Sequence, residues 1–273
     1  MQVPAHFEYE RATSVGHALA LLAKFGPESR VLAGGHSLIP MMKLRLAQPE
    51  TLIDINDLAE LGYLRVEQGE LRIGALTRHA ELLGSPLAGQ HFPILHDAER
   101  RIADPIVRNR GTVGGSLCQA DPSEDLSAAF AAVRATMMIH GSAGSRTVPE
   151  REFHLGPYET VVATGELLTE IRVPKPGAAG WSFQKFTQRA IDWAIVGVAV
   201  QGGNVALVNM AGTPLRAAGV EEALDGGAPP AEAAARAAEG TSAASDIRAS
   251  REYREHLARI LVSRALTEAT DRA

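Results

Sequence analysis

The sequence predicts an α+β protein with a larger N-terminal domain and a smaller C-terminal domain. Strand-like and helix-like segments alternate as far as Val173, and the cluster Pro174-Lys175-Pro176-Gly177 then interrupts the pattern. Beyond this cluster, three segments have the character of antiparallel strands, and helical segments follow them. We therefore expect domains over residues 1–176 and 177–273, and the 45% of hydrophobic residues is sufficient for a buried core.

The first residues predict a compact α/β unit. The helix expected over Thr13 to Phe25 places small and aliphatic side chains on one face, and Gly26-Pro27 ends it. A short strand over Arg30 to Leu32 leads into a Gly-Gly turn, after which Ser37 is expected to cap a second helix that continues to Leu46. Thr51 to Ile55 completes the unit as a strand.

Hairpin and helix signals alternate in the rest of the larger domain. Residues 63–66 and 70–75 predict paired strands around Gln68-Gly69. The segment Asp121-Pro122-Ser123-Glu124 is typical of a helix start, with Asp121 as the N-cap and Pro122 in the first turn. We also expect a short helix that begins at Thr77 and a second helix over 92–103. Further strands are expected over 136–140, 146–148 and 167–173.

The smaller domain is predicted to contain three antiparallel strands and several helices. The alanine-rich stretch 228–244 is short and compatible with a helix, so we do not expect it to be disordered. The strands are expected over 181–188, 195–201 and 205–210, and the helices over 215–224, from Ala231 onward and over 252–270.

Two glycine-rich stretches carry the strongest functional signal. They are Val31-Leu32-Ala33-Gly34-Gly35-His36-Ser37-Leu38 and Asn109-Arg110-Gly111-Thr112-Val113-Gly114-Gly115-Ser116. Because glycine has no Cβ, such a turn can direct successive backbone N–H groups at an anion, in what is called a nest. One such stretch is more often an ordinary tight turn, but two of them favour a pyrophosphate held from both sides. Neither stretch matches G-x-G-x-x-G, so the pattern indicates a dinucleotide site of a non-Rossmann type.

Other side chains are candidates for the same site. Asp125 can accept hydrogen bonds from ribose or ribityl hydroxyls, or serve only as an acidic residue in the first turn of a helix. Lys185 can offset phosphate or flavin charge, or be a solvated lysine on a strand. The ring of His36 can direct an N–H at a phosphate. Trp193 is expected in the core, unless it covers the face of a ring ligand.

Composition and motifs disfavour several classes of protein. The net charge of −5 argues against a general nucleic-acid surface, and no apolar run reaches the roughly 20 residues of a membrane helix. The N-terminus has neither the basic nor the apolar region of a signal peptide. Cys118 is the single cysteine, so we expect no internal disulfide, no iron–sulfur cluster, and a buried or half-buried thiol in a cytoplasmic protein. No metal-ligand spacing, nucleophile elbow or Walker-type lysine is present.

Several motifs together resemble the FAD-binding medium subunits of molybdenum hydroxylases. They are Ala33 to Arg45, Ile53 to Asn56 and Ile102 to Gly115, and the likeness continues through Leu167 to Pro174 and Asp192-Trp193-Ala194. This family includes carbon monoxide dehydrogenase medium chains and xanthine dehydrogenase FAD-binding subunits. The resemblance covers nearly the whole chain, and its motifs are specific.

The resemblance implies a fold and a set of FAD contacts. Residues 1–176 would form a FAD-binding domain of PCMH or vanillyl-alcohol-oxidase type, with α+β subdomains over about 1–57 and 58–176 and FAD between them. Residues 177–273 would form a C-terminal α+β domain of the carbon monoxide dehydrogenase flavoprotein type. Ile102 would pack against the isoalloxazine, Asp125 would bind the ribityl side, and Leu168 and Lys185 would complete the site near the ring. The pyrophosphate would be held by Val31, Leu32, Ala33, Gly34, Gly35, His36, Ser37 and Leu38, and by Thr112, Val113, Gly114, Gly115 and Ser116.

The resemblance also implies a role in a larger enzyme. A large molybdopterin subunit would hydroxylate the substrate, and a small subunit would carry 2Fe–2S clusters. This chain would pass electrons from the clusters through FAD to a quinone, NAD or oxygen. The expected assembly is a dimer of heterotrimers in the cytoplasm, able to associate with the inner face of the membrane. No catalytic or metal-ligating residue is expected in this chain.

The substrate and the type of enzyme have alternatives. Carbon monoxide is the substrate that we favour, and a purine, a nicotinate-like heterocycle or an aldehyde are the alternatives. A self-standing flavin oxidase or reductase would need its own substrate base and pocket, for which the sequence offers no clear candidate. A non-catalytic dinucleotide-binding or assembly protein is the third alternative.

Overall fold

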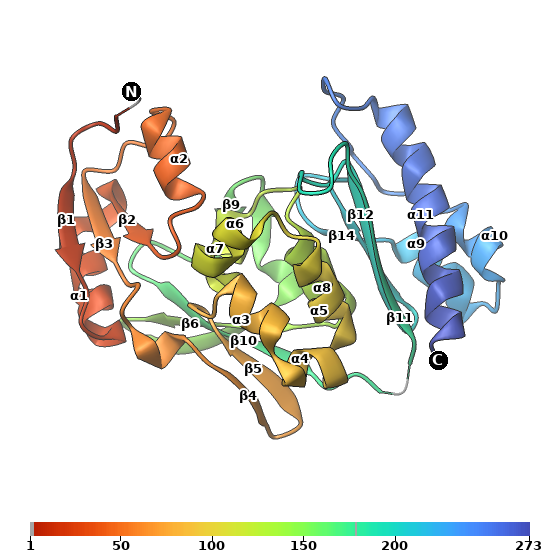
Figure 1. The fold of residues 1–273 in the computed structure, drawn as a ribbon, viewed down its shortest axis with the longest axis horizontal. Helices are drawn as coiled ribbons and strands as arrows, with labels where there is room; N and C mark the ends of the chain where they lie inside the picture. Colours follow the sequence, from red (N-terminus) through yellow and green to blue (C-terminus); the bar gives the residue numbers. More distant parts are fainter. Residues whose placement is uncertain (1–2, 178) are drawn as a thin grey trace.

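The computed structural model describes residues 3–177 and 179–273, and its N-terminal part is a small parallel sheet (Figure 1). Its strand order is β1-β3-β2, with Glu8 of β1 and Ser29 of β2 both opposite Thr51 of β3. Parallel strands need crossover connections, and both connections here are helical. The elements are β1 (Glu8–Arg11), α1 (Val15–Phe25), β2 (Ser29–Leu32), α2 (Leu38–Lys43) and β3 (Thr51–Asp54).

This part agrees with the expected α/β unit except around α2. The helix ends at Lys43 rather than at Leu46, and the Ser37 side chain makes no capping hydrogen bond. Helix α1 begins at Val15, two residues later than expected, and its N-cap is Ser14, whose hydroxyl accepts the His17 N–H at 3.0 Å.

A five-stranded antiparallel sheet forms the centre of the molecule. Its order is β4-β5-β10-β6-β7, and all neighbouring strands run antiparallel. The β4–β5 hairpin turns at Gln68 and Gly69, whose φ angles of 55° and 80° are typical of the type I′ turn that fits twisted strands. The strands are β4 (Leu64–Glu67), β5 (Glu70–Gly74), β6 (Thr136–Gly141), β7 (Gly144–Pro149) and β10 (Leu167–Pro174).

Helices α5 and α8 lie between the central sheet and the C-terminal sheet, and four shorter helices accompany them (Figure 1). Helices α4, α6 and α7, which have six, six and seven residues, were not predicted from the sequence. Helices this short contain too few turns to show a repeating apolar face. A signal was nevertheless present, because α4 and α6 each begin with proline after a capping Ser85 or Asp104. The helices are α3 (His79–Gly84), α4 (Pro86–His91), α5 (Pro93–Arg100), α6 (Pro105–Arg110), α7 (Val113–Gln119) and α8 (Asp125–Ala132).

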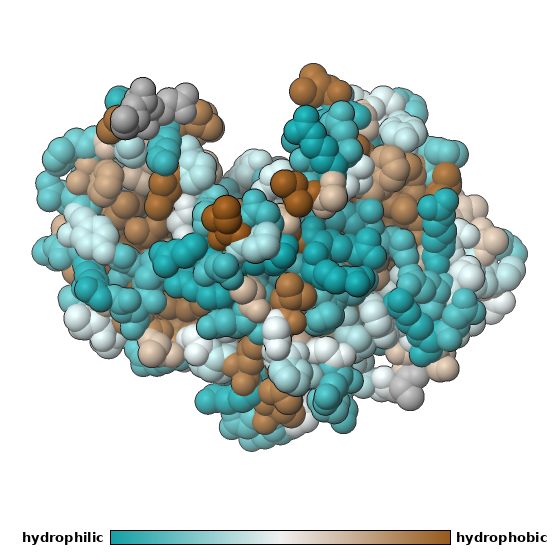
Figure 2. Space-filling view, in the orientation of Figure 1, coloured by the Kyte–Doolittle hydropathy of each residue, from teal (hydrophilic) through white to brown (hydrophobic). Residues whose placement is uncertain are grey.

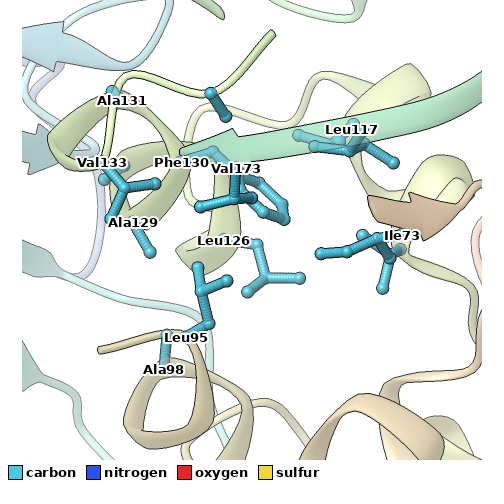
Figure 3. Close-up of a cluster of buried hydrophobic side chains, with 14 of the residues drawn as sticks. Ile73, Leu95, Ala98, Leu117, Leu126, Ala129, Phe130, Ala131, Val133 and Val173 are labelled. Atoms are coloured by element: carbon cyan, nitrogen blue, oxygen red, sulfur yellow. The ribbon is translucent and has the colours of Figure 1, made fainter. Parts of the chain in front are cut away.

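Helix α8 lies at the centre of the largest core. All of its residues are buried, and Leu126 and Phe130 pack with Leu95 of α5 and with Ile73 and Val173 of the sheet (Figure 3). A helix that is apolar on every face is an interior helix. A charged side chain in the first turn of α8 is therefore buried in the protein interior.

The C-terminal sheet has four antiparallel strands in the order β11-β12-β13-β14, rather than the three that we predicted. The added strand, Leu215–Arg216, occupies the first residues of the helix expected over 215–224, so that helix begins only at Ala218. Helices α11 and α8 both pack against β12, and every residue of β12 is buried. The elements are β11 (Trp181–Phe186), β12 (Val196–Gln201), β13 (Asn204–Val208), β14 (Leu215–Arg216), α9 (Ala218–Asp225), α10 (Pro230–Ala234) and α11 (Arg251–Asp271).

The remaining elements are short. Strands β8 (His154–Gly156) and β9 (Glu159–Thr160) pair with each other. Three 3₁₀ turns cover Gly26–Glu28, Ala59–Leu61 and Glu150–Glu152. Among the residues that the structure describes, no helix is both long enough and apolar enough to cross a membrane.

The N-cap of α8 is Glu124, so the prediction that Asp121 caps this helix is wrong. The Glu124 carboxylate accepts N–H groups from Leu126 at 2.9 Å and Ser127 at 2.7 Å, and the Ser116 hydroxyl at 2.9 Å. Asp121 closes a turn ahead of the helix, where its Oδ1 accepts the Ser123 N–H at 2.9 Å. The proline signal therefore marks this turn and not the first helical residue.

Replacement of these two acids should separate their roles. Glu124→Ala removes a buried cap, and we expect the free energy of unfolding to fall by about 1–2 kcal/mol. Asp121→Ala removes two hydrogen bonds in a partly exposed turn, from the Ser123 N–H and from the Tyr158 hydroxyl at 3.3 Å, and we expect a loss below about 1 kcal/mol. Denaturant unfolding of the full chain, followed by circular dichroism, measures both values. Equal losses, or a larger loss for Asp121→Ala, would contradict the assignment of the cap.

Candidate dinucleotide-binding site

The two glycine stretches, which we call the first glycine segment (residues 31–38) and the second glycine segment (residues 109–116), meet in space. A Cβ on Gly34 would lie 2.3 Å from Arg110 O and 2.8 Å from Gly111 Cα, so only glycine fits there. A Cβ on Gly115 would lie 3.9 Å from Ala33 Cβ. In Figure 1 the connection between β2 and α2 accordingly approaches α6 and α7. The two segments therefore pack directly against each other.

The first glycine segment has unused backbone donors. Val31 and Leu32 end β2, and Leu38 begins α2. Between them the chain turns at Gly35, where φ is 77°, a conformation that favours glycine. No N–H from Gly34 to Leu38 donates to an acceptor within the described residues 3–177 and 179–273. This run of free amides beside an exposed His36 has the geometry of an anion-binding nest.

The second glycine segment is different, and the prediction that it forms another nest is wrong. Thr112 is the N-cap of α7, so the Gly-Gly pair lies in the first turn of a helix. A Cβ on Gly114 would lie 2.6 Å from Ala75 Cβ, so this glycine permits α7 to pack closely on the end of β5. The amides are already hydrogen-bonded, Val113 N–H to Thr77 O at 2.9 Å, Gly114 N–H to Ala75 O at 2.9 Å and Gly115 N–H to Thr112 Oγ1 at 3.1 Å.

An arginine and an asparagine that were not predicted as site residues bridge the two segments. Arg78 donates through Nη1 to Arg110 O at 2.5 Å and through Nη2 to Asn56 Oδ1 at 2.9 Å. Asn56 in turn donates through Nδ2 to Ala33 O at 2.6 Å. Burial and the nearby Arg110 lower the pKa of Arg78. Only the position of Asn56 inside the recognised motif Ile53 to Asn56 could have indicated this bridge.

A second group of candidates gathers around a buried ion pair. Lys185 Nζ lies 2.6 Å from Asp125 Oδ2, and both side chains are 4% exposed. Lys185 Nζ also donates to Arg101 O at 3.0 Å, directly before the half-buried Ile102. Ile102, Asp125 and Lys185 thus come together from the end of α5, the start of α8 and β11. The alternative of a solvated Lys185 is wrong.

Asp125 is an acceptor that the protein does not fully use. Burial raises the pKa of Asp125 to about 7, the charge of Lys185 opposes this shift, and Glu124 and Glu99 add to it. Its Oδ1 is buried and has no hydrogen-bond partner among the described residues. A buried acceptor without a donor costs about 1–3 kcal/mol, so a ligand hydroxyl at this position would be stabilising.

Three other residues from the sequence predictions differ in their exposure to solvent. Leu168 of β10 is 3% exposed and belongs to the main core. Cys118 is exposed and Trp193 is 47% exposed, so the predictions that they are buried are wrong. The structure leaves Trp193 at the surface because the segment between β11 and β12 has few buried side chains.

The candidate site residues do not line either of two open cavities. One cavity of about 400 Å³ lies among Tyr63, Arg72 and Arg172, and another of about 460 Å³ lies between α10 and α11. Figure 2 shows instead a notch at the upper edge of the molecule, between the parts that contain α2 and α11 and above α6 and α7. Within the described ranges, no group of three or more His, Cys, Asp and Glu residues could hold a metal ion. The candidate site is therefore defined by free donors and buried charge.

Known proteins match the chain over almost its full length. The family described as the FAD binding domain in molybdopterin dehydrogenase matches residues 5–176, and the CO dehydrogenase flavoprotein C-terminal domain matches residues 181–269. The carbon monoxide dehydrogenase medium chain of Hydrogenophaga pseudoflava is 43% identical, with 98% of each chain covered. The glyceraldehyde dehydrogenase medium chain of Sulfolobus acidocaldarius is 35% identical, with 97% of this chain and 99% of that protein covered.

A solved structure agrees with these sequence matches. Carbon monoxide dehydrogenase from Hydrogenophaga pseudoflava, in a form that lacks the Mo-pyranopterin moiety, superposes with a TM-score of 0.95 at 42% identity, with 99% of each chain covered. The resemblance seen in the motifs and the α+β fold class are thereby confirmed. The chain belongs to the FAD-binding subunits of the molybdenum hydroxylases.

Proposed function

We propose that the chain binds FAD across its two glycine segments and passes electrons through it, as the flavin subunit of a three-subunit molybdenum hydroxylase. The observation that carries this proposal is the combination of free amides in the first glycine segment with the buried Asp125–Lys185 pair. FAD has a pyrophosphate that needs donors, and a ribityl chain and a ring that need polar and apolar contacts. Family membership supports the same cofactor.

The residues present fit the cofactor. The amides of Gly34 to Leu38, with His36 and Ser37, would hold the pyrophosphate from one side, and Val31 to Ala33 would support this turn. Residues 112–116 would form the opposite wall, where the glycines permit close approach although their amides are in use. The unpartnered Oδ1 of Asp125 would accept a ribityl hydroxyl. Ile102 and Leu168 would supply apolar surface near the ring, and Lys185 a positive charge.

When bound, FAD supplies both one-electron and two-electron redox chemistry. The chain's own residues bind and orient it. The Lys185 ammonium is held by Asp125 and Arg101 O at a position where it would stabilise negative charge on a ring. This role requires no catalytic acid–base pair in the chain.

The partners and the substrate are part of the same proposal. The partners are a large molybdopterin subunit and a small 2Fe–2S subunit in a dimer of heterotrimers, and the external acceptor is a quinone, NAD or oxygen. A single cysteine cannot ligate a cluster that takes about four thiolates, which supports a separate cluster subunit. Carbon monoxide is the substrate that we favour because of the 43% identical relative, while the glyceraldehyde dehydrogenase relative keeps an aldehyde as the alternative.

Two further features belong to this proposal. A reducing cytoplasm is supported by the single cysteine, which can form no internal disulfide. We also propose two domains, over residues 1–176 and 177–273, with subdomains over about 1–57 and 58–176 in the first. The Pro174 to Gly177 segment supports the limit between the domains, and the two family matches lie on either side of 177–180.

Reconstitution tests the proposed function. The chain loaded with FAD, which gives absorbance at about 450 nm, should show no hydroxylation of carbon monoxide, purines or aldehydes with a dye acceptor. Addition of the molybdopterin and 2Fe–2S subunits should restore turnover of one of these substrates. Turnover by the single chain would refute the three-subunit proposal and support a self-standing flavoenzyme.

Substitution of a glycine with positive φ tests the nest. Gly35→Ala places a Cβ 2.8 Å from Ile39 Cδ1 at a φ of 77°, and we expect the turn to shift and FAD binding to weaken by about 1–3 kcal/mol because amide donors are lost. Gly69→Ala is the matched control, because its φ is 80° and no atom lies within 4 Å of the added Cβ. Both variants should lose stability, but only Gly35→Ala should change the FAD dissociation constant. An unchanged constant in Gly35→Ala contradicts the nest.

Replacement of Asp125 should change both cofactor affinity and the pH dependence of stability. Asp125→Ala removes the proposed ribityl acceptor and should weaken FAD binding by about 1–3 kcal/mol. In the apoprotein, the folded state holds a proton on Asp125 up to about pH 7 that the unfolded state releases near pH 4. This group therefore makes stability fall as pH rises between these values, and the fall should be smaller in the variant. FAD titration and denaturant unfolding at pH 5 and 7.5 measure these effects, and parallel pH profiles would contradict the buried-acid assignment.

A further inference from the structure

We infer that Arg78 and His79, the two residues at the start of α3, form a positioning junction that fixes three parts of the FAD site relative to one another. These parts are the first glycine segment, the second glycine segment and the end of α5, which carries Ile102. The inference rests on the proposed function, because FAD is the ligand that the three parts would hold. Neither residue is expected to contact the reacting atoms, so both are positioning residues.

Arg78 connects the two glycine segments. Its planar guanidinium reaches Arg110 O in the second segment with one nitrogen and Asn56 Oδ1 with the other. Asn56 holds Ala33 O of the first segment. Since a lysine has a single ammonium on a flexible chain, it cannot reproduce this rigid two-point contact. The arginine therefore sets the spacing of the walls at the point where Gly34 touches Arg110 and Gly111.

His79 connects the second glycine segment to α5. Its backbone N–H donates to Gly111 O at 3.2 Å, and a Cβ on Gly111 would lie 2.8 Å from His79 Cδ2, so the ring lies directly against this glycine. On its other side, His79 Nδ1 lies 3.0 and 3.1 Å from the two oxygens of Glu99. Both side chains are buried, and Glu99 is 0% exposed.

Glu99 carries this connection to the ring end of the site. Its backbone carbonyl accepts the Ile102 N–H at 3.1 Å. Between them lies Arg101, whose carbonyl accepts the Lys185 ammonium. From the opposite side, Arg108 donates through Nη1 to Ile102 O at 2.6 Å and to Ala103 O at 3.1 Å. A displacement of Glu99 would therefore move the proposed ring contacts directly.

The energetics of the His79–Glu99 pair suit a fixed connection. The buried Glu99 carboxylate raises the pKa of His79 in spite of its burial, and burial raises the pKa of Glu99 itself, so a proton is retained within the hydrogen-bonded pair. Loss of one partner of a buried ion pair leaves an uncompensated charge, which is strongly destabilising. Arrangements in which α3 and α5 separate are consequently disfavoured. The pair holds α3 on α5 while Arg78 holds α3 on the first glycine segment.

Two variants and two matched controls test the junction in the full-length chain, alone or assembled with its partner subunits, whichever form retains FAD in the wild type. Arg78→Met breaks the bridge between the segments, and Glu99→Gln removes the counter-charge of His79. Arg134→Met removes another arginine–asparagine contact, in which two nitrogens of Arg134 donate to the single acceptor Asn204 Oδ1 at 2.8 and 3.1 Å. Asp246→Asn removes the counter-charge of the buried Arg254, at 2.8 Å.

We expect Arg78→Met and Glu99→Gln each to weaken FAD binding by about tenfold, which corresponds to about 1.4 kcal/mol. At saturating FAD, both should also change the visible circular dichroism of the bound flavin, because its orientation changes. The controls should lower the melting temperature but keep the FAD dissociation constant within about twofold of the wild type and the flavin spectrum unchanged. Arg78→Lys should fail to restore affinity, and it replaces Arg78→Met if that variant does not fold.

The outcomes are distinguishable. FAD affinities of Arg78→Met and Glu99→Gln that match the controls would overturn the junction and leave these residues as packing elements only. Full affinity in Arg78→Lys would overturn the two-point role of the guanidinium. Absence of FAD from the wild type, in both the isolated chain and the assembled enzyme, would overturn the proposed function and this inference with it.

Discussion

The backbone contact between Gly34 and the Arg110-Gly111 peptide is the constraint on which the rest of the site depends. At this contact no side chain can be accommodated, so the parallel N-terminal unit can approach the central domain only through glycine. The groups around the contact then follow from it. The Asn56 amide donates a hydrogen bond to the Ala33 carbonyl, and Arg78 donates to the Arg110 carbonyl across the contact. The amides from Gly34 to Leu38 remain without acceptors among the described residues. The requirement for glycine at position 34 thus determines where the free backbone N–H groups of the first glycine segment lie.

The two glycine segments look alike in sequence but differ in structure because their surroundings differ. The first follows β2, which is an edge strand of the three-stranded sheet, so few acceptors are near its amides. The second precedes a helix that packs on the end of β5, where the carbonyls of Ala75 and Thr77 take its first amides. These acceptors lie far from the second segment in sequence. Local composition therefore indicated positions that need glycine, but it could not predict which amides remain free.

Most of the fold could be predicted, and the failures have physical causes. The parallel unit, the hairpin at Gln68-Gly69 and the C-terminal strands follow from apolar periodicity and turn residues, which are local signals. Helices α6 and α7 are too short to have such periodicity. Asp125 and Lys185 were both candidates, but their direct pairing joins residues 60 positions apart and depends on how two sheets enclose α8. Arg78 gave no local signal, since its role comes entirely from tertiary contacts.

The Asp125–Lys185 pair has a consequence for how such subunits can diversify by recombination. The acid begins α8 in the part that matches the FAD-binding family, while the lysine lies on β11 in the part that matches the C-terminal family, so this ion pair does not belong to either module alone. A chimaera that took its C-terminal module from a parent without a cation at this position would place an uncompensated carboxylate in the interior, or force it to remain protonated. Viable crossovers must therefore inherit α8 and β11 from compatible parents. A crossover at the Pro174 to Gly177 segment would separate α8 from β11, so this segment is not by itself a position at which the two parts can be exchanged.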